Sequence, residues 1–93
     1  MSRSPNVIFI LADQLRADCV GCYGNDVIRT PHIDALAATG SRFSQTFAQH
    51  PQCAPSRAVL MTGRYAHVNG AVSNHTAMAT NEVTLGEYFR AAG

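Results

Sequence analysis

The stretch NVIFILAD, Asn6 to Asp13, is a near-continuous apolar run that ends in an acid. Strands buried on both faces of a parallel sheet have this composition, because helices cover them from either side. In open α/β sheets, ligands bind in the crevice outside the carboxyl ends of such strands. The stretch therefore predicts an α/β fold, and it places Asp13 and Gln14 at a strand tip that faces a crevice.

Helix signals follow this strand. In TPHIDALAATG, Thr30 is a candidate N-cap, Pro31 suits the first helical position, and Gly40 suits the end. PSRAVLMTGR predicts a second, short helix that ends near Gly63.

A third helix is predicted over TLGEYFRAAG, where Thr84 and Glu87 have the spacing of a capping box. Between the helices, SRFSQTFAQ, residues 41–49, favours a short strand. The polar segment HVNGAVSNHTAMATN, residues 67–81, favours a long loop, and long ordered loops commonly carry function.

The predicted elements do not make a complete sheet. One clear strand cannot pair with itself, and one strand with three helices is a poor architecture. A strand–helix alternation would next supply another parallel strand. We therefore expect residues 1–93 to form the incomplete N-terminal part of a longer α/β protein.

The composition argues against several classes of function. The net charge is +1, and 14% of the 93 residues are charged, well below the average of about 25%. This balance argues against broad electrostatic binding to nucleic acid or to an anionic membrane. The longest apolar run, Val7 to Ala12, is too short for a membrane span or a signal-peptide core. We expect a cytoplasmic protein in a reducing compartment.

Cys19 and Cys22 form a C-x-x-C pair, CVGC. A redox role needs the motif to open a helix after a strand, whereas the surrounding sequence predicts a loop. A zinc site needs four ligands, and no second clustered pair is present. Packing is the favoured role. A small C-x-x-C redox or binding module stays open as a rival interpretation, and it predicts a thiol pair that cycles with dithiol reagents.

The segment CAPSRAVLMTGR, Cys53 to Arg64, carries further chemistry. Cys53 lies at a predicted helix start, where free N–H groups and the helix dipole attract anions. Arg57 follows one turn later on the same face, and its guanidinium can bind two oxygens of a tetrahedral oxyanion. Asp13 adds a hard oxygen ligand for a divalent cation. Together these residues indicate oxyanion-ester chemistry with a metal.

CAPSRAVLMTGR resembles the sulfatase signature C-x-P-S-R-x-x-L-x-T-G-R at every fixed position. The flanking PNVIFILADQLRADCVGCYGN and VTLGEYFRAAG are also similar to that family, so the resemblance covers essentially the whole chain. It implies an alkaline-phosphatase-like α/β sandwich, with a largely parallel central sheet flanked by helices. It also implies a sulfuric ester hydrolase, of which this chain alone is expected to be inactive.

The resemblance implies that a formylglycine-generating enzyme converts Cys53 to an aldehyde, with Pro55 and Arg57 among the residues it recognises. One hydroxyl of the aldehyde hydrate would attack sulfur and displace the alcohol. Deprotonation of the other would re-form the carbonyl and release sulfate. Arg57 would hold the hydrate, and Asn74 matches an asparagine that contacts the substrate oxyanion.

The resemblance also implies a divalent metal held by Asp13, Gln14 and the modified Cys53. Calcium is expected first, with manganese, magnesium or zinc as alternatives. Many sulfatases have two adjacent acids where this chain has Asp13 and Gln14. The Asp-Gln variant resembles phosphonate monoester hydrolases and choline-sulfatase-like members, so hydrolysis of phosphonate or phosphate monoesters is the alternative activity.

Overall fold

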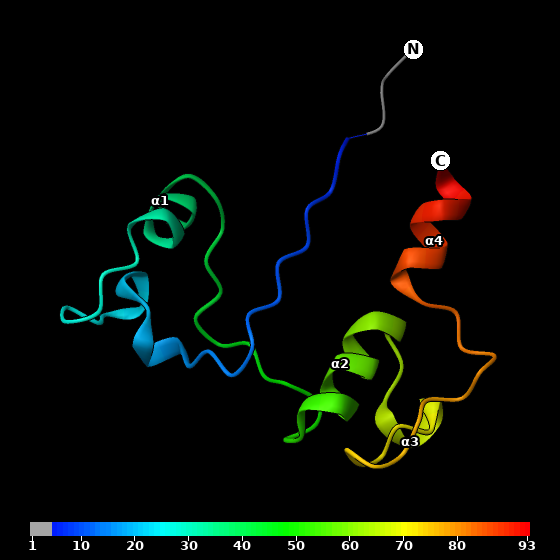
Figure 1. The fold of residues 1–93 in the computed structure, drawn as a ribbon. Helices are drawn as coiled ribbons and strands as arrows, with labels where there is room; N and C mark the ends of the chain where they lie inside the picture. Colours follow the sequence, from blue (N-terminus) through cyan, green and yellow to red (C-terminus); the bar gives the residue numbers. More distant parts are fainter. Residues whose placement is uncertain (1–4) are drawn as a thin grey trace. The chain divides into compact units, whose positions relative to one another are not determined.

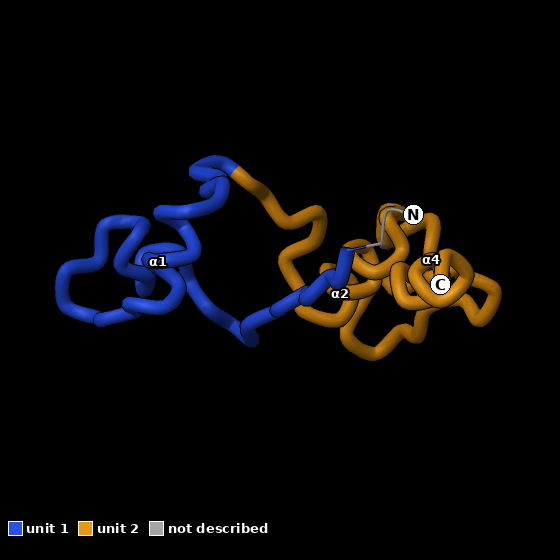
Figure 2. The backbone as a smooth tube through the Cα atoms, turned by 90° about the horizontal axis from the view of Figure 1, so that it is seen from above, with its two compact units in different colours: residues 1–45 blue, residues 46–93 orange. Residues whose placement is uncertain are grey.

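The computed structural model describes residues 5–93, and the chain divides into two compact units, residues 1–45 and 46–93 (Figure 2). The elements, in chain order (Figure 1), are η1 (Ala17–Cys19), η2 (Gly21–Tyr23), α1 (Pro31–Thr39), α2 (Cys53–Thr62), α3 (Ala66–Asn69) and α4 (Leu85–Ala92). None of the helices formed by residues 5–93 has the length and apolar composition of a membrane span.

The described part of the chain contains no β-strand, so the predicted sheet is not confirmed. Residues 5–12 run without helical turns (Figure 1), and the side chains of Val7 to Leu11 are between 41% and 85% exposed. The prediction that this run is buried is therefore wrong for residues 7–11 in the structure. Residues 41–49 also form no strand. The physical reason is that a strand is defined by hydrogen bonds to a neighbour, and residues 5–93 supply none.

The first unit is organised around the start of α1. Thr30 and Pro31 occupy the N-cap and first helical positions, as predicted. The Thr30 hydroxyl accepts the Gly21 N–H at 2.9 Å and donates to Asp34 Oδ1 at 3.0 Å. Asp34 Oδ1 also accepts the Cys22 N–H at 2.6 Å. Thr30 and Asp34 thereby fasten η2 to α1.

The C-x-x-C pair lies within this hydrogen-bonded loop. Cys19 is the last residue of η1, Cys22 is the middle residue of η2, and both are half-buried free thiols. Neither opens an α-helix, which is the setting that lowers a thiol pKa in redox C-x-x-C motifs. The loop geometry therefore does not favour the redox interpretation.

In the second unit, α2 ends at Gly63, which adopts the left-handed conformation with φ of 67° and donates its N–H to the Val59 carbonyl. This is the predicted end of the helix, and glycine adopts that conformation at no steric cost. The helix α3 was not predicted, because three of its four residues fall in the segment 67–81, which favours a loop. It packs against α2.

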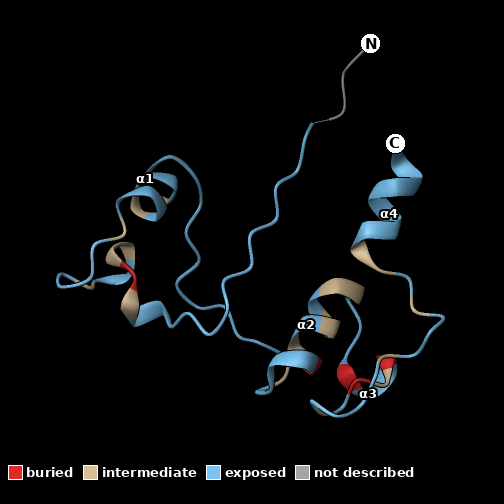
Figure 3. Cartoon of the chain, viewed as in Figure 1, coloured by how far each residue is buried: buried red, intermediate tan, exposed pale blue. Residues whose placement is uncertain are grey.

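Asn69, at the end of α3, is the fully buried polar residue of the second unit. Its Nδ2 donates to Thr62 Oγ1 at 3.3 Å and to the Arg64 carbonyl at 3.0 Å, while its Oδ1 accepts the Ala71 N–H at 2.9 Å. Its own carbonyl accepts the Ala79 N–H at 2.9 Å. Figure 3 shows buried residues at α3 and directly after it. Asn69 therefore links the end of α2 to the following loop.

We expect Asn69→Ala to destabilise the full-length protein by about 2–3 kcal/mol, because it leaves buried hydrogen-bonding groups without partners. Chemical denaturation followed by fluorescence measures the change. Asn81→Ala, at an exposed position of the same unit, is the matched control and should change stability by less than about 0.5 kcal/mol. Equal effects of the two substitutions would contradict the structural role of Asn69.

The helix α4 begins as predicted. Glu87 Oε2 accepts the Thr84 N–H at 2.7 Å and the Thr84 hydroxyl at 3.0 Å, which is the glutamate half of a capping box. These hydrogen bonds stabilise the carboxylate, so they lower the pKa of Glu87 below its ordinary value of 4.5. The start of α4 is thus coupled to the charge of one exposed carboxylate.

This coupling predicts a pH dependence. The pKa of Glu87 is lower in the folded state than in the unfolded state. The Glu87 carboxylate therefore stabilises the fold fully at pH values above its unfolded-state pKa, and this stabilisation is lost as pH falls through its folded-state pKa. We expect the difference in melting temperature between the wild type and Glu87→Gln to be fully developed above about pH 5 and to shrink in more acidic buffer. A difference that grows with acidification would contradict the assignment.

Candidate active site at the start of helix α2

Cys53 is the first residue of α2 and is exposed, with Gln52 as the N-cap. The Gln52 carbonyl accepts the Ser56 N–H at 3.0 Å, which closes the first turn. Pro55, the third residue of the helix, is buried, and its missing N–H costs nothing there because the first turn has no intrahelical partner for it. The sequence therefore starts a helix at Cys53, the first residue of the signature segment.

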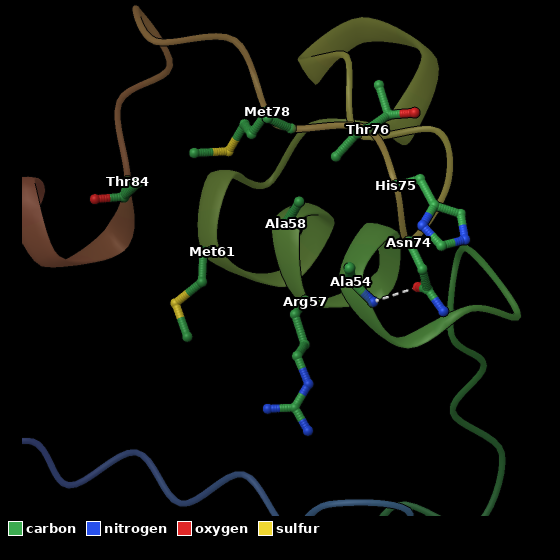
Figure 4. A pocket seen from close by; sticks show the side chains of 11 residues that line it. Ala54, Arg57, Ala58, Met61, Asn74, His75, Thr76, Met78 and Thr84 are labelled. Atoms are coloured by element: carbon green, nitrogen blue, oxygen red, sulfur yellow. Dashed lines mark hydrogen bonds between the residues drawn. The ribbon is translucent and has the colours of Figure 1, made fainter.

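Asn74 lies against this helix start, although it is 21 residues from Cys53 along the chain. Its Oδ1 accepts the Ala54 N–H at 3.1 Å (Figure 4) and lies 3.5 Å from Cys53 Sγ. Its backbone N–H donates to Gln52 Oε1 at 3.2 Å. The structure thus brings together Cys53 and Asn74, two of the predicted site residues, and makes Asn74 the cap of α2.

The loop that carries Asn74 is held by its own hydrogen bonds. The hydroxyls of Ser73 and Thr76 lie 2.7 Å apart, and the Thr76 N–H donates to the Ser73 carbonyl at 3.1 Å. The His75 N–H donates to Ser73 Oγ at 3.2 Å. A self-bonded turn of this kind presents Asn74 in one conformation rather than many.

Arg57 lies one turn after Cys53 on α2. With Asn74 it lines a hollow of about 570 Å³ in the second unit. Figure 4 shows the Arg57 side chain extending from α2, with Asn74 and His75 beside the start of the helix. His75 also lines the hollow, and the other lining residues are mainly small or apolar: Ala54, Ala58, Met61, Ala71, Thr76, Ala77, Met78 and Thr84. The hollow therefore combines an apolar lining with a guanidinium, a carboxamide and an imidazole.

Arg64, the last fixed residue of the signature, has a structural role. Its Nη1 donates to Glu82 Oε1 at 2.9 Å and to Oε2 at 3.1 Å. The Glu82 side chain is 5% exposed, whereas that of Arg64 is 53% exposed. Because the buried carboxylate needs a partner, Arg64 fastens the segment that precedes α4.

Asp13 and Gln14 lie in the first unit, at the end of the run 5–12, and both are exposed. Gln14 has φ of 52°, the left-handed region that a residue with a Cβ seldom adopts, so the chain turns directly after Asp13. A carboxylate and a carboxamide offer oxygen ligands, which calcium and other hard cations prefer. The pair fits such an ion as part of a larger ligand set, since calcium takes about six to eight oxygens.

Residues 5–93 contain no group of three or more His, Cys, Asp or Glu side chains that could hold a metal ion. Just beyond Gln14, Arg16 Nε donates to Asp18 Oδ1 at 2.9 Å, and Nη2 pairs with Oδ2. This bidentate hydrogen bond lowers the pKa of Asp18 and raises the pKa of Arg16. Asp18 therefore helps to fix the loop after the Asp13–Gln14 pair.

Two residues of this region were not predicted from the sequence. Gln52 contacts Asn74 across 22 residues, and Glu82 contacts Arg64 across 18. A polar residue at the N-cap position marks Gln52 as a candidate for hydrogen bonding. The sequence contains no signal for the partner that either residue selects.

Comparison with known proteins relates the chain to a family of hydrolases. The family model described as Sulfatase matches residues 5–93. An uncharacterized sulfatase of Escherichia coli, YidJ, is 41% identical over 98% of this chain, an ulvan-active sulfatase of Formosa agariphila is 47% identical over 82%, and human steryl-sulfatase is 51% identical over 74%.

The chain belongs to the sulfatase family. Membership implies an alkaline-phosphatase-like α/β fold, of which residues 5–93 show helices. The chain spans 18%, 15% and 12% of the lengths of these three relatives, respectively. The relatives are all named as sulfatases, which are hydrolytic enzymes.

Proposed function

We propose that this chain is the N-terminal part of a sulfatase catalytic domain that hydrolyses sulfate esters. The observation that carries the proposal is the cluster at the start of α2, where an exposed Cys53 and Asn74 Oδ1 lie 3.5 Å apart and Arg57 follows one turn later. The names of the relatives support sulfate over phosphonate esters. The Asp13–Gln14 pair is the residue-level reason to test phosphonate esters beside them.

The residues of this chain would bind a tetrahedral oxyanion. A sulfuryl group beside residue 53 would meet the positive end of the α2 dipole. The Arg57 guanidinium could hold two of its oxygens through parallel hydrogen bonds, which fixes the orientation as well as the charge. Asn74 would add a neutral donor beside the same position. The apolar hollow lined by Met61 and Met78 is continuous with Arg57 and Asn74.

Cys53 is proposed as the precursor of a formylglycine formed by a formylglycine-generating enzyme. The fixed residues Pro55 and Arg57 are present at the spacing of the signature. A formylglycine hydrate supplies a geminal hydroxyl pair, which permits attack on sulfur and later release of sulfate. Exposure of residue 53 at the helix start leaves room for a substrate to approach.

A divalent cation, calcium in the first instance, is proposed to bind Asp13 and Gln14 together with residue 53 and ligands outside residues 5–93. It would supply positive charge next to the sulfuryl oxygens and the nucleophile. Gln14 contributes an oxygen without charge, so the site carries less negative charge than one with two adjacent acids. Such a site tolerates a more highly charged substrate group, such as the dianion of a phosphate monoester, which is one basis of the alternative activity.

The proposal is tested with the full-length protein, co-expressed with a formylglycine-generating enzyme. Its kcat/KM is measured for 4-nitrophenyl sulfate and for a 4-nitrophenyl phosphonate monoester. Faster turnover of the sulfate supports the proposal. Faster turnover of the phosphonate would assign the alternative activity to the same site, and turnover of neither would contradict both.

Metal removal gives a second prediction. Prolonged dialysis against a chelator is expected to lower the rate of sulfate ester hydrolysis by at least about 100-fold, because several kcal/mol of charge stabilisation is lost. Addition of calcium, manganese, magnesium or zinc identifies the ion by the recovery of activity. Full activity in a sample shown to be metal-free would contradict the proposed cofactor.

A further inference from the structure

The Gln52 side chain is placed unusually for an N-cap residue. It makes no hydrogen bond to the first turn of its own helix. Its Oε1 instead accepts the backbone N–H of Asn74 at 3.2 Å. The capping role passes to Asn74, whose Oδ1 accepts the Ala54 N–H at 3.1 Å.

Two hydrogen bonds, one on either side of Cys53 in the sequence, thus tie Asn74 to the start of α2. One bond runs from the Asn74 backbone to Gln52, and the other runs from the Ala54 backbone to the Asn74 side chain. Two bonds fix both the position of the Asn74 backbone and the direction of its side chain. Together with the self-bonded turn Ser73–Thr76, they leave little freedom to Asn74.

The same geometry orients the Asn74 carboxamide. Because Oδ1 accepts a backbone N–H, the other end of the amide must be the NH₂ group. Asn74 Oδ1 is also 3.5 Å from Cys53 Sγ, so the carboxamide lies beside the reactive position. The NH₂ group is therefore the part of Asn74 that remains to donate to a bound oxyanion.

We propose that Gln52 is a positioning residue, which holds Asn74 so that its NH₂ group donates to the tetrahedral oxyanion bound at residue 53. This inference rests on the proposed function. A purely structural role for Gln52 makes a different prediction, since it would affect stability and leave the contribution of Asn74 to turnover unchanged.

Kinetics of the full-length protein test the proposal through a double-mutant cycle. Gln52→Met keeps the length of the side chain and removes the acceptor oxygen. It is expected to lower kcat/KM for 4-nitrophenyl sulfate about 10-fold in the wild-type background and less than about 2-fold in the Asn74→Ala background. Gln49→Met, an exposed glutamine three residues earlier, is the matched control and should have no effect. Rates are normalised to the fraction of residue 53 that is converted, as measured by mass spectrometry.

Hydrogen exchange gives a readout that does not depend on activity. Gln52→Met should speed exchange of the Asn74 amide, which loses its acceptor, whereas Gln52→Glu retains an acceptor oxygen and should keep it slow. Unchanged exchange at Asn74 in Gln52→Met, or equal losses of kcat/KM in both backgrounds, would overturn the proposal even if the protein is an active sulfatase. If the wild type turns over no ester, the proposed function fails, and with it the donor role of Asn74. The exchange result then decides only whether Gln52 holds Asn74.

Discussion

Replacing Cys53 with alanine in the full-length protein is expected to lower kcat/KM for an aryl sulfate by at least about 1,000-fold. Cys53 is exposed, begins α2 and lies 3.5 Å from Asn74 Oδ1. Alanine removes the thiol whose oxidation would give the proposed aldehyde, and no neighbouring side chain can replace it. Because residue 53 is exposed, the substitution should leave the melting temperature nearly unchanged.

The other thiols provide the control for this prediction. Cys22 is half-buried in η2 and is assigned to packing, so Cys22→Ala should keep kcat/KM within about 3-fold of the wild type. A large loss in both variants would point to unfolding rather than chemistry. Wild-type activity in Cys53→Ala would remove Cys53 from the mechanism.

Arg57→Ala is expected to lower kcat/KM by about 100- to 1,000-fold, because a charged donor to the transferred group is lost. Arg57→Lys keeps the charge but not the planar pair of donors, so it should recover only part of that loss. Arg90→Ala, on the exposed face of α4, controls for the general effect of removing a positive charge. The measurement is steady-state kinetics, with the converted fraction of Cys53 determined for each variant.

One outcome would contradict the proposed role of Arg57. If Arg57→Ala and Arg90→Ala had the same kcat/KM at equal conversion of Cys53, Arg57 would have no role at the oxyanion. If Arg57→Ala instead lowered the fraction of Cys53 that is converted but left the rate per converted molecule unchanged, Arg57 would act only in recognition by the modifying enzyme.

The helices could be predicted from the sequence because their signals are local. Pro31 starts α1, Gly63 ends α2, and Glu87 bonds to Thr84 three residues earlier. The strand predicted from Val7 to Ala12 depends on partners far along the chain, and the described residues do not supply them. Apolar composition alone therefore predicted a burial that the structure does not show.

The candidate site could likewise be predicted only where its signals are local. The signature marks Cys53 and Arg57, and the family resemblance indicated Asn74, which the structure brings to the start of α2. The acceptor that Gln52 offers to Asn74 could not be predicted, because it depends on how a loop 22 residues away folds back. Positioning residues of this kind depend on tertiary contacts that carry no periodic or motif signal.

The central claim is that Cys53 is the precursor of the reactive group. Trypsin cleavage after Arg42 and Arg57 gives a peptide, residues 43–57, with Cys53 as its cysteine. Mass spectrometry of this peptide, from full-length protein co-expressed with a formylglycine-generating enzyme, tests the claim directly. The account predicts the mass of an aldehyde in place of the thiol and reaction with a hydrazide probe, in proportion to sulfatase activity. An intact thiol at Cys53 in fully active protein would contradict it.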